Sequence, residues 1–156
     1  MKHIQFWKPS LVLSLSLLAI GTSPAPSWAA ESGTAAEAKA MLEKAVVALK
    51  TNQADALARF QKGEGGFKDR DLYVFCIGPD GIYSAQPEYK GEHVSKVFDP
   101  TGKVMGAEML KVAQEGKISE MSYLAHRPGS DPSAHVPKVA YFTKVGDQVC
   151  GVGYYP

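Results

Sequence analysis

The apolar run Leu72–Ile77 constrains the fold of this chain more than any other stretch. Its aromatic and β-branched residues are typical of a strand that is buried on both faces. Pro-Asp-Gly at 79–81 then signals a turn and Ile82-Tyr83 restarts the apolar pattern, so the segment predicts a β-hairpin. A strand with no polar face belongs in the middle of a sheet that is covered on both sides. Its side chains alternate, so one face should carry Tyr73, Phe75 and Ile77, and the other Leu72, Val74 and Cys76.

The rest of the chain contributes elements that can pair with this strand or cover it. Apolar residues at helical spacing predict three helices, over residues 35–50, 55–61 and 104–114. Alternating or apolar stretches predict three further strands, over residues 118–124, 136–145 and 148–155. Thr34 is expected to cap the first helix, with Glu37 as its reciprocal partner. The order is therefore two helices, two strands, a helix and three strands, the last three forming an antiparallel meander.

Residues 1–29 have the pattern of a secretory signal peptide. Two lysines precede an apolar run over residues 11–20, and a Ser-Trp-Ala end places small residues where signal peptidase reads them. We expect cleavage after Ala29 or Ala30 and export to the periplasm or the medium; an uncleaved leader would instead anchor the chain to the membrane. No later stretch is apolar enough to cross a membrane, so residues 30–156 are expected to form one soluble domain.

The charge of the exported part argues against two classes of partner. The leader holds two of the 17 basic residues and none of the 16 acidic ones, which leaves one more acidic than basic residue in the remainder. Such a balance does not favour binding to nucleic acid or to anionic lipid.

The cysteines Cys76 and Cys150 both lie in strand-like sequence. An oxidising compartment makes them candidates for a disulfide, provided that the two strands are adjacent. The alternative is that both are small buried apolar residues. Neither belongs to a Cys-x-x-Cys redox pair or a haem-attachment motif.

Several short motifs follow one another in a specific order. After the long first helix come Phe67-x-Asp69-x-Asp71-Leu72-Tyr73-Val74-Phe75, Asp80-Gly81, Asp99-x-x-Gly102-Lys103, Tyr123, Pro137-Lys138-Val139-Ala140-Tyr141 and Val152-Gly153-Tyr154-Tyr155. In this order they cover nearly all of residues 30–156. They resemble the single Cache domain family, the PAS-like ligand-sensing domains of bacterial chemoreceptors and histidine kinases.

This resemblance implies an α+β fold of the PAS-like Cache type. It implies a five-stranded antiparallel sheet with the long N-terminal helix on one face and a ligand pocket on the other. The first and last strands would lie side by side, which places Cys76 and Cys150 on neighbouring strands. Ligands of similar domains are small organic acids or amines. The family often has a histidine before proline in the second strand; here that position holds Gln86, which removes a titratable donor.

Candidate ligand-binding residues follow from the resemblance and from their chemistry. Lys138 and Tyr141, three residues on, lie on the strand expected to line the pocket, where an ammonium and a hydroxyl could hold a carboxylate. Tyr123 and Arg127 could approach from the neighbouring strand and its turn. The alternative for these residues is a solvated lysine, a solvated arginine and a core tyrosine. The wall of the pocket is expected to include Tyr73, Phe75 and Gln86.

The sequence shows no pattern of an enzyme. No serine has a Gly-x-Ser-x-Gly context, no pair of carboxylates suggests acid–base chemistry, and no glycine-rich phosphate loop is present. We therefore expect no catalytic residue, no cofactor and no resident metal. One alternative is a small exported metal enzyme that uses His126, Asp131 and His135, although their spacing matches no metal motif.

The functional prediction is an exported, non-enzymatic sensor module that binds a small organic ligand, with a carboxylate favoured. Relatives carry a membrane-spanning helix and an output domain, and this sequence ends at Pro156 with neither. We therefore expect the domain to pass its ligand-bound state to a membrane receptor or histidine kinase, or to buffer the ligand. A second alternative is a periplasmic interaction or assembly factor that kept the fold and lost the ligand.

Overall fold

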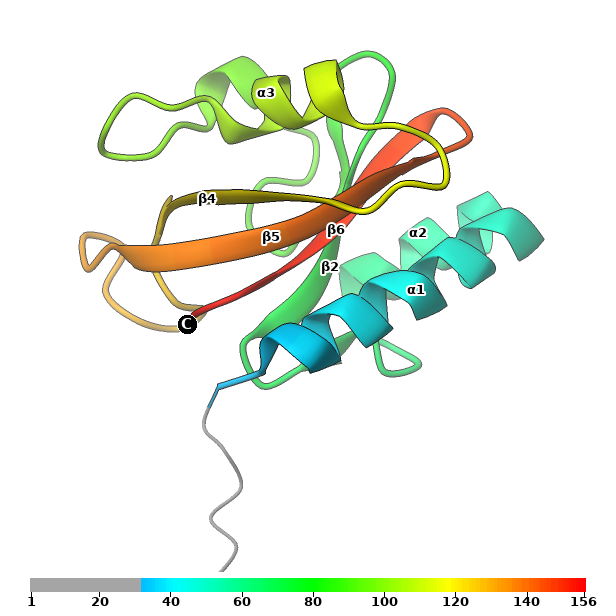
Figure 1. Ribbon diagram of the computed structural model, residues 1–156, viewed down its shortest axis with the longest axis horizontal. Coiled ribbons are helices and arrows are strands. Elements are labelled where there is room, and N and C mark those ends of the chain that lie inside the picture. Colours follow the sequence, from blue (N-terminus) through cyan, green and yellow to red (C-terminus); the bar gives the residue numbers. More distant parts are fainter. Residues whose placement is uncertain (1–31) are drawn as a thin grey trace, which may run out of the picture.

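The computed structural model describes residues 32–156, so the predicted signal peptide lies outside the described residues (Figure 1). Its helices are α1 (Ala35–Thr51), α2 (Gln53–Lys62), the short 3-10 helix η1 (Val94–Lys96) and α3 (Met105–Val112). Its strands are β1 (Lys68–Asp69), β2 (Leu72–Ile77), β3 (Tyr83–Ala85), β4 (Ser119–Ala125), β5 (Val136–Val145) and β6 (Gln148–Tyr154). No helix among residues 32–156 has both the length and the apolar content needed to span a membrane.

The strands form one antiparallel sheet in the order β1-β2-β6-β5-β4, with β3 paired to β2. The predicted fold class and order of elements are confirmed. The sheet has six strands rather than the five expected, because the two-residue strand β1 folds back on the start of β2. The first long strand β2 and the last strand β6 are neighbours, as the family resemblance implied. The predicted hairpin pairs Ile77 with Tyr83.

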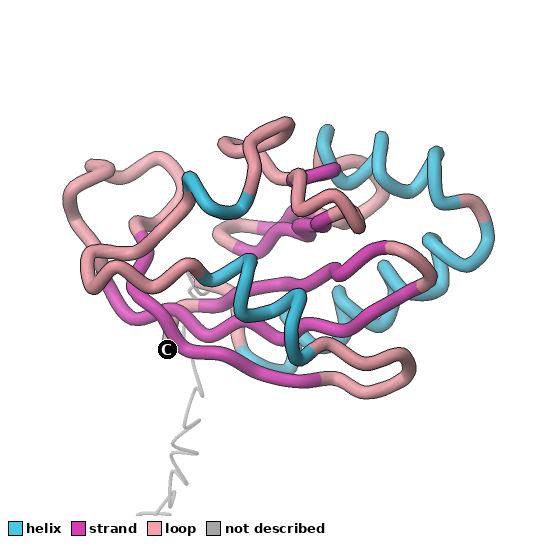
Figure 2. The backbone as a smooth tube through the Cα atoms, turned by 90° about the horizontal axis from the view of Figure 1, so that it is seen from above, coloured by secondary structure: helices cyan, strands magenta, loops and turns pink. Residues whose placement is uncertain are grey.

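Helix α1 covers one face of the sheet, and α3 with its loops lies over the other (Figure 1). The expected capping box begins α1: the Thr34 hydroxyl accepts from the Glu37 amide, and the Glu37 carboxylate accepts from the Thr34 amide. Asn52 ends α1 and caps α2, so the two helices form a hairpin with a very short connection (Figure 2). Apolar side chains at helical spacing face the sheet from α1, namely Ala38, Met41, Leu42, Ala45 and Leu49.

The two faces of β2 divide the core as the alternation predicted. Leu72, Val74 and Cys76 pack in the cluster under α1 and α2. Phe75 and Ile77 belong to a second cluster with Val94, Val97 and Met109, which connects η1 and α3 to the opposite face. The sheet is therefore covered on both sides.

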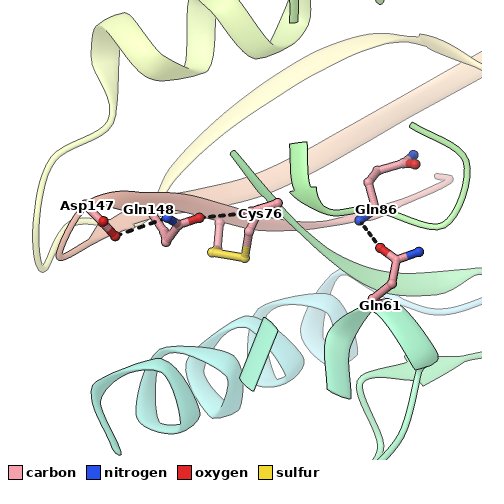
Figure 3. The surroundings of a disulfide bond; sticks show 7 residues. Gln61, Cys76, Gln86, Asp147 and Gln148 are labelled. Carbon is pink, nitrogen blue, oxygen red and sulfur yellow. Dashed lines mark hydrogen bonds between the residues drawn. A yellow bond between two sulfur atoms is a disulfide. The ribbon is translucent and has the colours of Figure 1, made fainter. Parts of the chain in front are cut away.

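A disulfide joins β2 to β6 in the middle of the sheet (Figure 3). Cys76 and Cys150 are directly opposite each other in the antiparallel pairing, with their Cα atoms 4.1 Å apart, and both are fully buried. The disulfide, which was one of two alternatives in the sequence analysis, is thus present, and the two strands that carry it are adjacent. It belongs to the cluster on the α1 side of the sheet.

Candidate functional site

A cavity of about 70 Å³ lies between the sheet and the segments that cover its α3 side. Strands β2, β4 and β5 supply its inner wall and α3 with the loops after β3 and before α3 supply its roof. Five of the seven predicted binding residues line it: Tyr73, Phe75, Gln86, Tyr123 and Lys138. The volume is enough for several water molecules, or for a ligand of a few heavy atoms.

Two glycines on β6 leave room on this face of the sheet for side chains from the neighbouring strands. A methyl group at Gly153 would lie 2.3 Å from the Lys138 Cε atom, and one at Gly151 would lie 2.5 Å from the Phe75 ring. Both distances are too short for real carbon atoms, so side chains at these positions would fill the space that Lys138 and Phe75 occupy. The alternating glycines of this strand therefore allow a long side chain to lie flat against the sheet.

Lys138 is the most unusual residue of the cavity. Its side chain is only 1% exposed, and its Nζ atom donates to the Tyr73 hydroxyl at 2.9 Å. The ammonium also lies over two aromatic rings, 4.3 Å from the centre of Tyr73 and 4.8 Å from that of Tyr155. Burial lowers the pKa of Lys138, because a charge is less stable away from water. No salt bridge within residues 32–156 includes Lys138, and the carboxylates of Asp71 and Glu88 act on its charge only from a longer distance.

Tyrosines surround this buried lysine. Burial raises the pKa of Tyr73 and Tyr123, and it raises that of Tyr83 to about 12. The pKa of Tyr89 is raised by the same cause. These hydroxyls therefore stay protonated at physiological pH and can donate hydrogen bonds. An ammonium and several phenol hydroxyls around one small space form a surface that complements an anion.

Gln86, at the position where the family often has a histidine, holds part of the cavity wall in place through hydrogen bonds. Its backbone amide donates to the Gln61 side chain of α2 at 2.9 Å (Figure 3). Its own side-chain oxygen accepts from the backbone amides of Glu88 and Tyr89. Gln86 thus fixes the turn that carries Glu88 and Tyr89 into the wall of the cavity. At 5% exposure it is a buried structural residue that also contacts the space.

Tyr141 is the first predicted site residue that the structure places elsewhere. It contacts the α1-side cluster and stacks on Tyr154, with ring centres 5.7 Å apart. Residues three apart on a strand point to opposite faces, so Lys138 and Tyr141 cannot both enter one cavity. The pairing of these two residues was wrong for that reason.

Arg127 also lies outside the cavity wall. It donates to the Asp71 carboxylate and to the Ser32 hydroxyl, both at 2.7 Å, and its guanidinium stacks on Tyr155 at 4.5 Å. The same Asp71 accepts from the Gly33 amide at 2.6 Å. Arg127 therefore ties the loop after β4 to the segment before α1, and its predicted contact with a ligand does not belong to this cavity.

The alternative metal site receives no support from the described residues. His126 and His135 do come together, with ring centres 6.2 Å apart, but Asp131 accepts from Ser133 in its own turn. Within residues 32–156 no group of three or more histidine, cysteine, aspartate or glutamate side chains could hold an ion. Both histidines instead line the cavity.

Several cavity residues were not predicted from the sequence. They are Tyr83, Glu88, Tyr89, Val97, Phe98, Met105, Met109, Leu124, Ala125, His126 and His135. Most belong to the segments between β3 and α3 or to the loop after β4. The sequence held one weak signal for them, namely single aromatic and apolar residues such as Tyr89, Val97 and Phe98 in a stretch otherwise typical of loops.

A family model of the single Cache domain, described as Single Cache domain 2, matches residues 28–155. The chain belongs to this family. The prediction made from the motif order is confirmed. No curated protein sequence matches this Cache domain.

Solved structures share the fold of this Cache domain at low sequence identity. A methyl-accepting chemotaxis protein from Vibrio parahaemolyticus RIMD 2210633 is 24% identical, with a TM-score of 0.58, over 77% of this chain and 86% of that chain. A periplasmic sensor domain of a chemotaxis protein is 21% identical, with a TM-score of 0.55, over 76% and 87% of the two chains. A Cache chemosensory domain described for its carboxylic acid recognition is 17% identical, with a TM-score of 0.57, over 77% and 91%.

Proposed function

We propose that this Cache domain is an exported binding module for a small organic acid, whose carboxylate contacts Lys138. The observation that carries the proposal is the buried Lys138, which has a hydroxyl and two aromatic rings as direct neighbours but no carboxylate in salt-bridge contact within residues 32–156. Removing an ammonium from water costs several kcal/mol unless a counter-ion compensates. A ligand carboxylate in the adjoining cavity would supply that counter-ion.

The surroundings of Lys138 support an anion over an amine. A cationic ligand would meet a like charge in a small space, and the neutral tyrosine hydroxyls can donate to carboxylate oxygens. The apolar part of the wall, which includes Phe75, Val97 and Met109, suits the short carbon chain of such an acid. A structural neighbour described for carboxylic acid recognition adds weight to this choice of ligand.

The proposal includes a partner for the bound state. Two structural neighbours belong to chemotaxis proteins. We infer that this domain passes its ligand-bound state to a membrane receptor or a histidine kinase after export by the predicted signal peptide. Capture of one such membrane protein by the acid-loaded domain, and not by the empty domain, is the expected result of a pull-down from membranes.

Thermal unfolding with a panel of small acids and amines tests the choice of ligand. A ligand at a hundred times its dissociation constant stabilises the native state by about 2.7 kcal/mol. We expect acids such as acetate, propionate, lactate and pyruvate to raise the midpoint and the matching amines to leave it unchanged. A panel in which no acid stabilises the protein would overturn the proposal.

The variant Lys138→Met tests the role of the buried ammonium. We expect at least a tenfold loss of acid affinity, since the charge-assisted hydrogen bond disappears. The free energy of unfolding should stay unchanged or rise by about 1 kcal/mol, because a buried charge without a salt-bridge partner is replaced by an apolar chain of similar length. Lys144→Met is the matched control, because Lys144 lies on the same strand with its side chain exposed. Equal acid affinity in both variants would contradict the assignment of Lys138.

A further inference from the structure

The outer end of the cavity differs chemically from its inner end. Lys138 at the inner end is 1% exposed, whereas the Glu88 side chain in the same wall is 41% exposed. Among the described residues Glu88 is in direct contact with His126 and not with Lys138, on whose charge it acts from a longer distance. The cavity therefore has a buried cation at one end and a separate carboxylate toward solvent.

Glu88 is held in place by its neighbours on both sides. Its backbone amide donates to the Gln86 side chain at 2.5 Å, and its two carboxylate oxygens lie 3.1 and 3.0 Å from the His126 Nε2 atom. The Glu88 side chain is 41% exposed, so its contact with His126 contributes little to folding. The position of Glu88 in the wall is thus well defined, although the stability of the fold does not require its charge.

His135 adds a second acceptor at this end. Its Nδ1 atom faces the Ser133 carbonyl oxygen at 3.0 Å, a contact that needs a proton on Nδ1. In the neutral ring the other nitrogen, Nε2, is then an acceptor. The Glu88 carboxylate and the His135 imidazole both line the outer end of the cavity. Since both can accept hydrogen bonds, a ligand with a hydrogen-bond donor complements this end.

We propose that Glu88 is a specificity-determining residue, and that it selects short carboxylic acids that also carry a hydrogen-bond donor. The inference rests on the proposed binding of a carboxylate at Lys138. A hydroxyl or ammonium group on the ligand donates to Glu88, which a plain alkyl acid cannot do. A second carboxylate on the ligand is repelled by Glu88. The volume of about 70 Å³ limits the ligand to a few heavy atoms.

Isothermal titration calorimetry with four acids tests this selection on the wild-type protein, purified in its exported form after expression of the full-length chain. Propionate carries no donor, lactate carries a hydroxyl, alanine carries an ammonium and succinate carries a second carboxylate. We expect lactate, alanine or both to bind at least tenfold more tightly than propionate, and succinate to bind most weakly. The ratio of lactate to alanine affinity identifies which donor the site prefers. Propionate binding as tightly as both donors, or succinate binding most tightly, overturns the inference.

The variant Glu88→Met assigns the selection to one side chain, since it removes the charge and both acceptors at similar length. We expect the favoured donor acid to lose about tenfold in affinity and propionate to change by less than about twofold. Glu92→Met is the matched control, because Glu92 pairs with Lys96 at 3.1 Å and does not line the cavity. Equal losses for propionate and the donor acid overturn the inference.

The same titrations separate this inference from the proposed function. If Lys138→Met abolishes binding of every acid while the wild-type protein does not distinguish lactate, alanine and propionate, the role of Glu88 alone is wrong. If none of the four acids binds the wild-type protein, or if Lys138→Met binds them all unchanged, the proposed function fails and the role of Glu88 fails with it.

Discussion

The two faces of the sheet in this Cache domain differ in packing and polarity. On the α1 side, β2 and β6 present Leu72, Val74 and Val152 to the helix, and none of these side chains is exposed. On the α3 side, β2 presents Tyr73 to a cavity lined by a buried lysine, and two glycines of β6 lie against Phe75 and Lys138. One face is packed to exclude ligands, and the other keeps a polar space open.

This difference indicates which face of the sheet contributes more to the stability of the fold. Burial of apolar side chains contributes about 25 cal/mol for each Å² removed from water, and the α1 side collects most of the fully buried aliphatic residues of the described chain. The α3 side keeps Lys138 and several hydroxyls away from bulk water, which costs free energy. We therefore expect changes on the α1 side to lower stability without altering affinity, and changes on the α3 side to alter affinity with little loss of stability at neutral pH.

Loss of the disulfide should give the largest effect on the α1 side. The bond closes a loop of 74 residues, and the chain-entropy model assigns such a bridge about 4 kcal/mol. The double variant Cys76→Ala/Cys150→Ala is expected to lower the free energy of unfolding by about that amount, as measured by urea denaturation. Reduced wild-type protein is the control for the loss of the bridge without the change of side chains. A marked loss of acid affinity in the folded variant would break the separation of the two faces.

Leu42→Ala should have the next largest effect. Leu42 is fully buried between α1 and the sheet, so its truncation removes apolar contacts and leaves a cavity. Such changes cost about 2–5 kcal/mol. Urea denaturation measures the loss, and titration with the best acid at a temperature where the variant is folded should give an unchanged dissociation constant. Val47→Ala on the exposed side of α1 is the control, because Val47 is 65% exposed.

Tyr83→Phe, on the α3 side, should have the smallest of the three effects, a change in the free energy of unfolding at alkaline pH. The folded protein raises the pKa of Tyr83 from 10.0 to about 12, so the unfolded chain loses this proton first as the pH rises. The stabilising contribution is complete below pH 10 and is lost as the pH approaches 12. Tyr83→Phe should therefore flatten the fall in stability above about pH 10, by roughly 1 kcal/mol at about pH 11. Parallel curves for the two proteins in urea denaturation would contradict this assignment.

The sequence predicted most of the fold because local patterns controlled it. Alternation and β-branched composition gave β2 and β5 with their observed ends, Leu72–Ile77 and Val136–Val145. The capping box at Thr34 placed the start of α1. The adjacency of Cys76 and Cys150 came from the family resemblance, since no local pattern reveals which strands pair. The two-residue strand β1 was missed because so short a segment carries no periodicity.

The site was predicted less completely than the fold. Lys138 and Tyr73 line the cavity, and the family resemblance had pointed to Lys138. Tyr141 lies on the other face, because residues three apart on a strand point in opposite directions. Glu88 and His126 meet from loops that are 38 residues apart in sequence, and Arg127 is held by Asp71 at a separation of 56 residues.

The sequence by itself determined the long helices and strands, the two-sided burial of the central strand and the membership of the Cache family, because each follows from periodic spacing or from motif order. Only the tertiary structure decided which side chains share the cavity. Loop residues such as Glu88 and His126 have no period, so their direction depends on long-range contacts that form only when the sheet has closed. The burial of Lys138 without a salt bridge was likewise decided by the tertiary structure, because burial is a property of packed elements rather than of a residue type.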